Sequence, residues 1–312
     1  MWRLLALPGL VAWIGCAGAP RHDISTRLTT PEGALPAGVE RAFALTTADG
    51  LSQPLDLVVD PAGRLLVLDG DGPDILVYDE GGRPLDRWSV SGSDDRWFFR
   101  PSVIGVSGLA VLLMDQGDQV IRRFDLRGQF QGTLLDLTSS DLARVIGFIQ
   151  PADFVADEAG QVYITDREGH RVLVFDSSSR YVRQFGTFGA GAGQLRSPDA
   201  ISVDPAGGLY VADIGNHRVQ GIDGFGTPLR AVEVPDSTPD DPRIAVDVAS
   251  LPGDVVLIAD DRGRLTAISP SGRSLFSYYL PGLSRVAVGA DGRIFVLARE
   301  PARVEALDVG GL

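Results

Sequence analysis

The chain has 312 residues, a length that suits two average domains or one large all-β domain. Hydrophobic residues make up 44% of it, enough for a sizeable core. It contains no lysine, and its formal net charge of −13 argues against nucleic-acid binding through phosphates. The 38 glycines and 20 prolines indicate many turns between short strands, and the single cysteine, Cys16, excludes an intramolecular disulfide.

Residues 1–15 have the features of a secretory leader. A positive start at Arg3 is followed by an apolar run, residues 4–14, that is too short to span a bilayer. Gly15 then precedes Cys16, and this resembles a bacterial lipoprotein signal, in which such a cysteine is lipidated and becomes the mature N-terminus. The resemblance implies a membrane-anchored envelope lipoprotein, at the outer membrane facing the periplasm if the host has two membranes. The alternative is an ordinary cleaved signal peptide with an incidental cysteine.

Residues 16–38 are rich in Ala, Pro, Thr and Gly, which predicts a flexible tether that begins with lipidated Cys16. The repeats begin after this tether. From residue 39 to residue 312 the chain reads as one repeat domain. In five units an aspartate, which we call the marker, closes the second strand: Asp69, Asp115, Asp166, Asp213 and Asp260. In the sixth unit Ala298 stands at this position. Ten residues later the third strand usually ends in another acidic residue, so a constant interval recurs within variable outer spacing.

Each unit of about 40–50 residues contains short alternating apolar strands, the pattern of a four-stranded propeller blade. We therefore predict an all-β fold, a six-bladed β-propeller. The sixth unit stops too soon for a fourth strand, and Val39–Thr46 has a strand pattern without a unit of its own. This N-terminal strand is predicted to complete the last blade and close the ring, whereas an open solenoid would leave both ends uncapped. Residues 139–145 predict a helical turn capped by Ser139.

Two units carry a polar triplet after the second strand, Gly169, His170 and Arg171 in the third and Asn216, His217 and Arg218 in the fourth. With the preceding Asp213 and Pro198, the second triplet closely resembles the NHL repeat. The resemblance implies a six-bladed propeller and a structural role for both histidines, each bonding a neighbouring loop. It does not imply one function, because NHL relatives include binding and scaffold modules, RNA-binding domains and some enzymes.

Six further residues are predicted to form a layer at the mouth of the central channel. Each lies thirteen residues before a marker, where the inner strand of its blade begins: Asp56, Ser102, Asp153, Ala200, Asp247 and Arg285. Carboxylates brought together in alternate blades need a cation, raised pKa values or a counter-ion. Asp56, Asp153 and Asp247 are thus a candidate site for calcium or another divalent cation. Alternatively each aspartate caps its own turn, or Arg285 neutralises part of the ring.

The sequence carries no nucleophile elbow, P-loop or dinucleotide-binding motif, and residues 186–193 predict a flexible inter-blade loop with nothing specific for phosphate. We assign no catalytic residue and expect a lipid-anchored binding or scaffold module. Its partner would be a protein, peptide or glycan at the loop face, with membrane contact through the anchor only and no nucleic acid. The alternative is a metal-dependent lactonase- or lyase-like hydrolytic enzyme that uses the channel mouth. The sequence sets no oligomeric state.

The lipid anchor gives a first testable prediction. If Cys16 is acylated, Cys16→Ser should release the protein from the membrane fraction or block its processing, because the acyl chains supply the membrane affinity. Fractionation of cells expressing each form, followed by immunoblotting, measures this. Equal membrane association of wild type and variant would contradict the lipoprotein interpretation.

Overall fold

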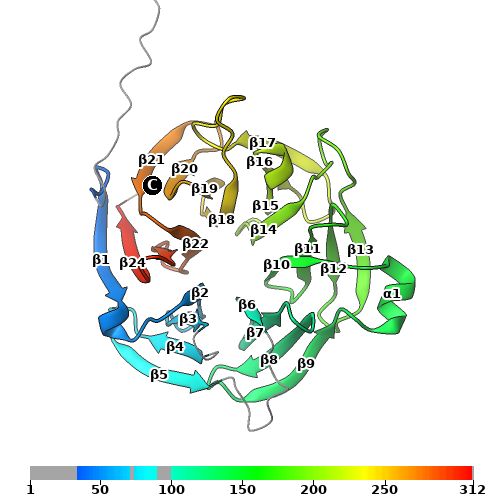
Figure 1. Ribbon diagram of the computed structural model, residues 1–312, viewed down its shortest axis with the longest axis horizontal. Helices are drawn as coiled ribbons and strands as arrows, with labels where there is room; N and C mark the ends of the chain where they lie inside the picture. The colour runs from blue at the N-terminus through cyan, green and yellow to red at the C-terminus, as the bar shows by residue number, and fades with distance from the viewer. Residues whose placement is uncertain (1–33, 71–73, 90–99, 311–312) are drawn as a thin grey trace, which may run out of the picture.

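A computed structural model describes residues 34–70, 74–89 and 100–310. The predicted leader, Cys16 and most of the tether lie outside the described residues. The described chain forms six four-stranded antiparallel sheets arranged as a ring around a central axis (Figure 1). This confirms the predicted six-bladed β-propeller.

The strands follow one another blade by blade. Blade 1 holds β2 (Pro54–Val59), β3 (Leu65–Asp69), β4 (Asp74–Tyr78) and β5 (Pro84–Ser89). Blade 2 holds β6 (Pro101–Ser107), β7 (Ala110–Asp115), β8 (Val120–Asp125) and β9 (Phe130–Asp136). Blade 3 holds β10 (Pro151–Ala156), β11 (Val162–Asp166), β12 (Arg171–Phe175) and β13 (Tyr181–Phe185).

The second half of the ring repeats this order. Blade 4 holds β14 (Pro198–Val203), β15 (Leu209–Asp213), β16 (Arg218–Ile222) and β17 (Pro228–Glu233). Blade 5 holds β18 (Ala245–Leu251), β19 (Val255–Asp260), β20 (Arg264–Ile268) and β21 (Ser274–Tyr279). Blade 6 combines β22 (Leu283–Val288), β23 (Ile294–Ala298) and β24 (Arg303–Val309) with β1 (Val39–Thr46).

The N-terminal strand closes the ring. β1 pairs antiparallel with β24 along its length and is the outermost strand of blade 6, as Figure 1 shows at the rim. The predicted closing strand, Val39–Thr46, is therefore confirmed with the same boundaries. The two ends of the propeller are joined by backbone hydrogen bonds, so blade 6 does not present the edge of a three-stranded sheet.

The core lies between neighbouring blades. Side chains alternate along each middle strand: Leu65 and Val67 pack toward blade 6, whereas Leu66 and Leu68 pack toward blade 2. Both faces of β3 are covered, so all five of its residues are buried. The same arrangement recurs at every blade junction, which explains why the second strands read as continuous apolar runs in the sequence.

A buried polar cluster fastens β1 to the last blade. The Glu305 carboxylate, fully buried on β24, accepts a hydrogen bond from Arg41 Nε at 2.9 Å and another from the Tyr278 hydroxyl at 2.6 Å. Arg303 pairs with its second oxygen. Because these donors come from β1, β21 and β24, the cluster joins the N-terminal strand to blades 5 and 6. Loss of one partner would leave the buried Glu305 charge less fully compensated.

Three smaller features complete the description. The predicted helical turn is α1 (Ser140–Ile146), but Ser139 at its N-cap makes no side-chain capping bond, so the expected cap is wrong. Leu35, which was placed in the tether, packs against the core between blades 5 and 6. Within the described ranges no helix has the length and apolarity needed to cross a bilayer.

Ring closure gives a second prediction. A chain that begins at residue 47 loses β1, including the buried side chains of Val39 and Leu45. At roughly 1.5–3 kcal/mol per buried side chain, we expect the free energy of unfolding to fall by about 3–6 kcal/mol, or the protein to aggregate through the exposed edge of β24. Urea denaturation measures the loss, with a chain that begins at residue 34 as control. Equal stability of the two truncations would contradict closure by β1.

Candidate functional site

The central channel is lined by the innermost strands of all six blades and encloses a cavity of about 730 Å³. The lining includes Asp56, Asp153, Asp247 and Arg285, so the structure brings together four residues of the predicted layer. The other two do not contribute to the lining. The Ser102 hydroxyl donates to the Met114 carbonyl at 3.4 Å, and Ala200 is buried in the core between blades 4 and 5.

Each of the three aspartates bridges two blades. Asp56 accepts from its neighbour Leu57 N at 2.9 Å and from Ile104 N of blade 2 at 2.9 Å. Asp153 repeats this geometry, accepting from Phe154 N and from Ile201 N of blade 4. The innermost strands have no neighbour on their channel side, so these carboxylates satisfy backbone donors that would otherwise face the cavity.

The third bridge runs from Asp247 on blade 5 to Val286 N on blade 6, at 2.7 Å. Blades 1, 3 and 5 thus supply the acceptors, and blades 2, 4 and 6 supply the backbone donors. Sequence reasoning placed the three aspartates in register but did not anticipate these bonds between blades. The alternation of blades with and without the aspartate is the signal that could have suggested them.

Arg285 is the counter-ion of the layer. Its Nε lies 3.3 Å from Asp56 Oδ1 and its Nη1 lies 4.0 Å from Asp247 Oδ1. In the part of the chain that the structure describes, no group of three or more His, Cys, Asp or Glu side chains is arranged to hold a metal ion. The calcium or other divalent-cation site stays a prediction; in the structure the carboxylate oxygens accept hydrogen bonds from backbone N–H groups and lie beside the Arg285 guanidinium.

Burial shifts the protonation of this layer. Burial raises the pKa of Asp153 well above its usual range, and although Arg285 opposes the rise, Asp247 and Asp56 add to it. Burial likewise raises the pKa of Asp247 to about 7, against the opposing effect of Arg285. The layer can therefore hold protons at neutral pH, a property that general acids and bases in active sites share.

The NHL-type residues lie where the second strands of blades 3 and 4 end and the third strands begin. The marker Asp213 accepts from Arg196 N at the entry to blade 4 and pairs with Arg218 Nε at 2.8 Å. Asp166 does the same in blade 3, with Gln150 N and Arg171. These two marker aspartates therefore tie the start of their blade to the turn after its second strand, which gives the repeat interval a physical cause.

The two motif histidines contact the next blade in opposite ways. His170 Nδ1 accepts from Ser197 N at 3.0 Å, at the start of blade 4. His217 Nδ1 lies 3.1 Å from the Arg243 carbonyl, which can only accept, so this nitrogen carries the proton. Both rings bond the loop that leads into the following blade, and neither lies in a metal-holding group of the described residues.

The motif arginines also fasten the loops that enter their own blades. Arg218 donates to the carbonyls of Ala190, Gly191 and Gln194, each at 2.9 Å. Asn216 adds a bond to the Gly189 carbonyl at 2.9 Å. Residues 186–193, expected to form a flexible loop, belong to a loop of residues 186–197 that these hydrogen bonds instead hold in place. The polar residues of the motif supply the donors that its glycine-rich sequence lacks.

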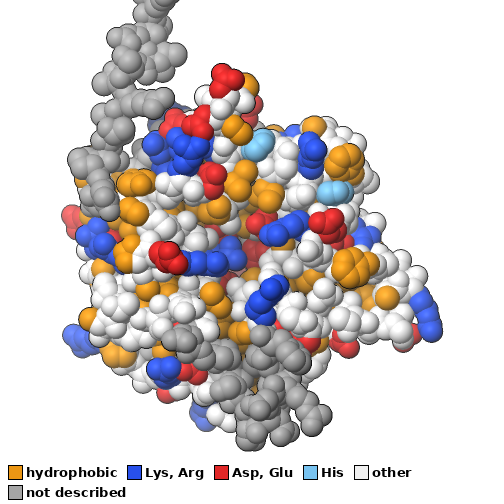
Figure 2. Space-filling view, viewed as in Figure 1, with side chains coloured by type: hydrophobic (Ala, Val, Ile, Leu, Met, Phe, Trp, Pro, Cys, Tyr) orange, Lys and Arg blue, Asp and Glu red, His pale blue; other side chains and the backbone are white. Residues whose placement is uncertain are grey.

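Exposed aromatic side chains project from these fastened loops. Phe188 is 63% exposed on the loop held by Arg218, and Phe148 is 77% exposed on the loop whose Ile146 carbonyl accepts from Arg171 at 2.7 Å. We call the side of the propeller that carries these loops and both described histidines the loop face. Figure 2 shows this face, with arginines and acidic side chains gathered around the hollow at its centre. Sequence reasoning missed both phenylalanines.

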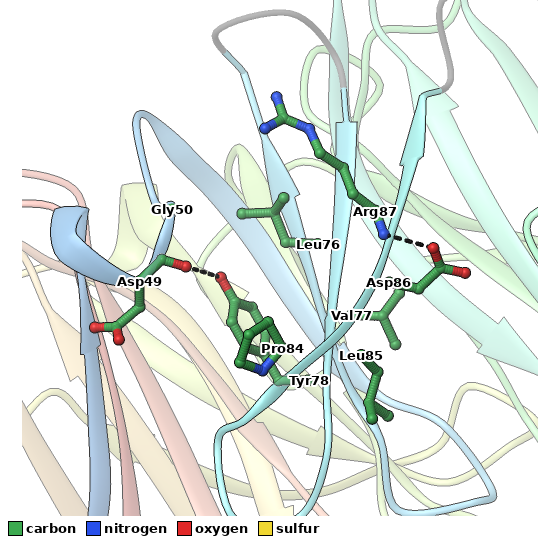
Figure 3. A pocket seen from close by; sticks show the side chains of 9 residues that line it. All are labelled: Asp49, Gly50, Leu76, Val77, Tyr78, Pro84, Leu85, Asp86 and Arg87. Atoms are coloured by element: carbon green, nitrogen blue, oxygen red, sulfur yellow. Dashed lines mark hydrogen bonds between the residues drawn. The ribbon is translucent and has the colours of Figure 1, made fainter.

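A second hollow, of about 350 Å³, lies at the rim between blade 1 and the 3₁₀ turn η1 (Thr47–Asp49) that follows β1 (Figure 3). The Tyr78 hydroxyl donates to the Asp49 carbonyl at 3.1 Å across it, and Arg87 N donates to the side chain of Asp86 beside it. The bond from Tyr78 joins the turn after the closing strand to blade 1, so the hollow marks the seam of the ring.

Comparison with known proteins agrees with the repeat structure. The NHL repeat family matches residues 148–175 and 195–222, which contain both motif triplets. Human NHL repeat-containing protein 3 is 27% identical over 168 residues, covering 48% of this chain and 45% of that protein. The match thus spans less than half the length of this relative. The chain is a six-bladed β-propeller, and its third and fourth blades match the NHL repeat.

Solved structures with the same fold have diverse roles. A streptogramin B lyase superposes with a TM-score of 0.64 at 14% identity, covering 87% of this chain and 97% of that one. A gluconolactonase from Xanthomonas campestris gives 0.61 at 16% identity, with 85% and 89% coverage. A chain of the nidogen–laminin complex gives 0.54 at 16% identity, with 72% and 80% coverage. At these identities the likeness shows the fold alone.

The protonation of Asp247 gives a third prediction. Its pKa is about 7 in the folded protein and about 3.9 in an unfolded chain, so the folded state binds more protons between these values. Stability contributed by this group is therefore present at low pH and lost as pH rises from about 4 to about 7. Asp247→Asn removes the titration, so its free energy of unfolding should decline less steeply over that window.

Urea denaturation at several pH values from about 4 to about 7 measures the two slopes. Asp176→Asn is the matched control, because backbone hydrogen bonds lower the pKa of exposed Asp176 and it titrates below the window. A slope for Asp247→Asn that equals the wild-type slope would contradict a raised pKa at this position.

Proposed function

We propose that this propeller is a lipid-anchored binding or scaffold module of the cell envelope that binds a protein, peptide or glycan through its loop face. The observation that carries the proposal is the display of Phe148 and Phe188 on loops held by the NHL-type arginines. A solvent-exposed aromatic ring on an ordered loop buries apolar area on binding without the entropic cost of ordering the loop. Aromatic and arginine side chains also dominate the energetics of protein interfaces.

Attachment at Cys16 would keep such a module at a membrane surface, with the intervening residues acting as a spacer. The formal charge of −13 disfavours nucleic acid as a partner. Among the structural neighbours, the nidogen–laminin chain comes from a protein–protein complex, which supports the idea that this fold suits such a role.

A hydrolytic enzyme that uses the channel is the second candidate, favoured by one observation, the near-neutral pKa of Asp247 beside a cavity of about 730 Å³. The lyase and gluconolactonase neighbours share the propeller fold. Against this candidate, both Asp56 and Asp153 bind backbone donors through each of their oxygens. Carboxylates used in this way hold blades together and are poorly placed to transfer protons to a substrate, so the binding module is the better-supported function.

Panning of the purified full chain against a phage-displayed random peptide library tests the binding module. We expect enriched clones whose binding falls at least tenfold with the double variant Phe148→Ala, Phe188→Ala, because both exposed rings are lost. The matched control is Leu109→Ala, Phe225→Ala, which removes two equally exposed side chains, 75% and 83%, from hairpins on the opposite face. Failure to enrich any clone, or equal binding by both double variants, would contradict the proposal.

A further inference from the structure

The loop of residues 186–197 presents three side chains together. The His170 ring centroid lies 4.9 Å from the Phe188 ring centroid, and the Arg196 guanidinium lies over the Phe188 ring, 5.7 Å from its centroid. Phe188 and Arg196 are both exposed, and His170 is half-buried. An apolar surface is thus flanked by two nitrogen-bearing groups.

Arg196 is anchored through its backbone, and its charge is left available. Its N–H donates to Asp213, which holds the residue in place. Across residues 34–70, 74–89 and 100–310, no carboxylate pairs with the Arg196 guanidinium and no carbonyl accepts a hydrogen bond from it. It is also the only charged residue in the loop 186–197. In a chain with a formal charge of −13, this is a local cationic position with unused hydrogen-bond donors.

His170 adds a hydrogen-bond donor, its Nε2–H group, to the same cluster. Because its Nδ1 accepts from Ser197 N, the neutral ring carries its proton on Nε2. Within the described residues Nε2 has no hydrogen-bond partner. The bond from Ser197 also fixes the orientation of the ring beside Phe188.

The opposite face contains a similar pair in which the guanidinium is already used. Arg183 lies 5.7 Å from the centroid of the Phe225 ring, the same distance as in the loop-face pair. However, Arg183 donates to the Gly224 carbonyl within that hairpin. The difference between the pairs is therefore the free guanidinium of Arg196 and the adjacent histidine.

We infer that Phe188, Arg196 and His170 form a subsite for a peptide in which an acidic side chain adjoins an apolar one; this rests on the proposed binding function. The apolar side chain packs on the Phe188 ring, and the carboxylate accepts charge-assisted hydrogen bonds from Arg196 and a neutral one from His170 Nε2. One unpaired guanidinium matches one carboxylate, whereas a polyanion would be repelled by the charge of the whole chain.

The test uses fluorescein-labelled, C-terminally amidated glycine pentapeptides that contain a central Leu-Asp or Leu-Asn pair. Fluorescence anisotropy with the full chain should show at least tenfold tighter binding of the Leu-Asp peptide at low salt, and the difference should shrink as salt is added. Arg196→Ala should abolish the preference, and Arg196→Lys should retain part of it because the charge remains. Phe188→Ala should weaken binding of both peptides.

Charge reversal separates recognition from a folding defect. Arg196→Glu should reject the Leu-Asp peptide and prefer a Leu-Lys peptide, an outcome that an unfolded variant cannot give. Arg183→Ala and Phe225→Ala, on the opposite face, should leave both affinities unchanged. Thermal melts of each variant check that the propeller is intact.

Equal affinity of the wild type for the Leu-Asp and Leu-Asn peptides would overturn the carboxylate subsite while leaving a binding module in place. Binding of neither peptide would also overturn it, and the library panning would then decide the proposed function separately. A preference for Leu-Asp that survives in Arg196→Ala would assign the recognition to other residues and overturn the inference as well.

Discussion

The innermost strand of every blade has an edge without a neighbouring strand, and the rest of the structure depends on how that edge is satisfied. Backbone donors facing a narrow channel need acceptors. Asp56, Asp153 and Asp247 each provide two, one within their own blade and one in the next. Arg285 balances part of the negative charge of these carboxylates. The raised pKa of Asp153 favours its protonated, neutral form, which lowers the charge further. The same carboxylates that resemble a catalytic or metal-binding layer are thus part of the inter-blade framework.

Closure of the ring imposes a second constraint, since six blades bury their faces only if the first and last meet. β1 provides the missing strand of blade 6, and blade 1 packs against that blade through a shared apolar cluster. The buried Glu305 binds Arg41 from the N-terminal strand, so closure involves a specific polar contact as well as strand pairing. Each blade therefore has a neighbour on both sides, as a propeller requires.

The loop face shows how one repeat motif serves both folding and display. Asp213 and Arg218 join the start of blade 4 to the turn after its second strand. The other N–H groups of Arg218 donate to carbonyls of the loop 186–197, which leads into this blade. Phe188 projects from that loop beside His170. The two motif histidines occupy equivalent positions but use Nδ1 in opposite ways, one accepting and the other donating. Equivalent positions in a repeat therefore share geometry without sharing chemistry, which is why function must be argued from individual residues.

The sequence alone determined the fold, the boundaries of the closing strand and the register that brings Asp56, Asp153 and Asp247 to one level. These features follow from the alternation of apolar and polar residues along each strand and from the constant spacing between the start of the inner strand and the marker. Both patterns can be read from residues that are close together in the chain. The packing of the blades against one another determines what the carboxylates bind, because the Ile104, Ile201 and Val286 N–H groups belong to other blades. The tertiary structure also decided that residues 186–197 are held in place and that Phe188 is exposed beside Arg196. The hydrogen bonds that set these positions join residues that are distant in the chain, and no local pattern records them.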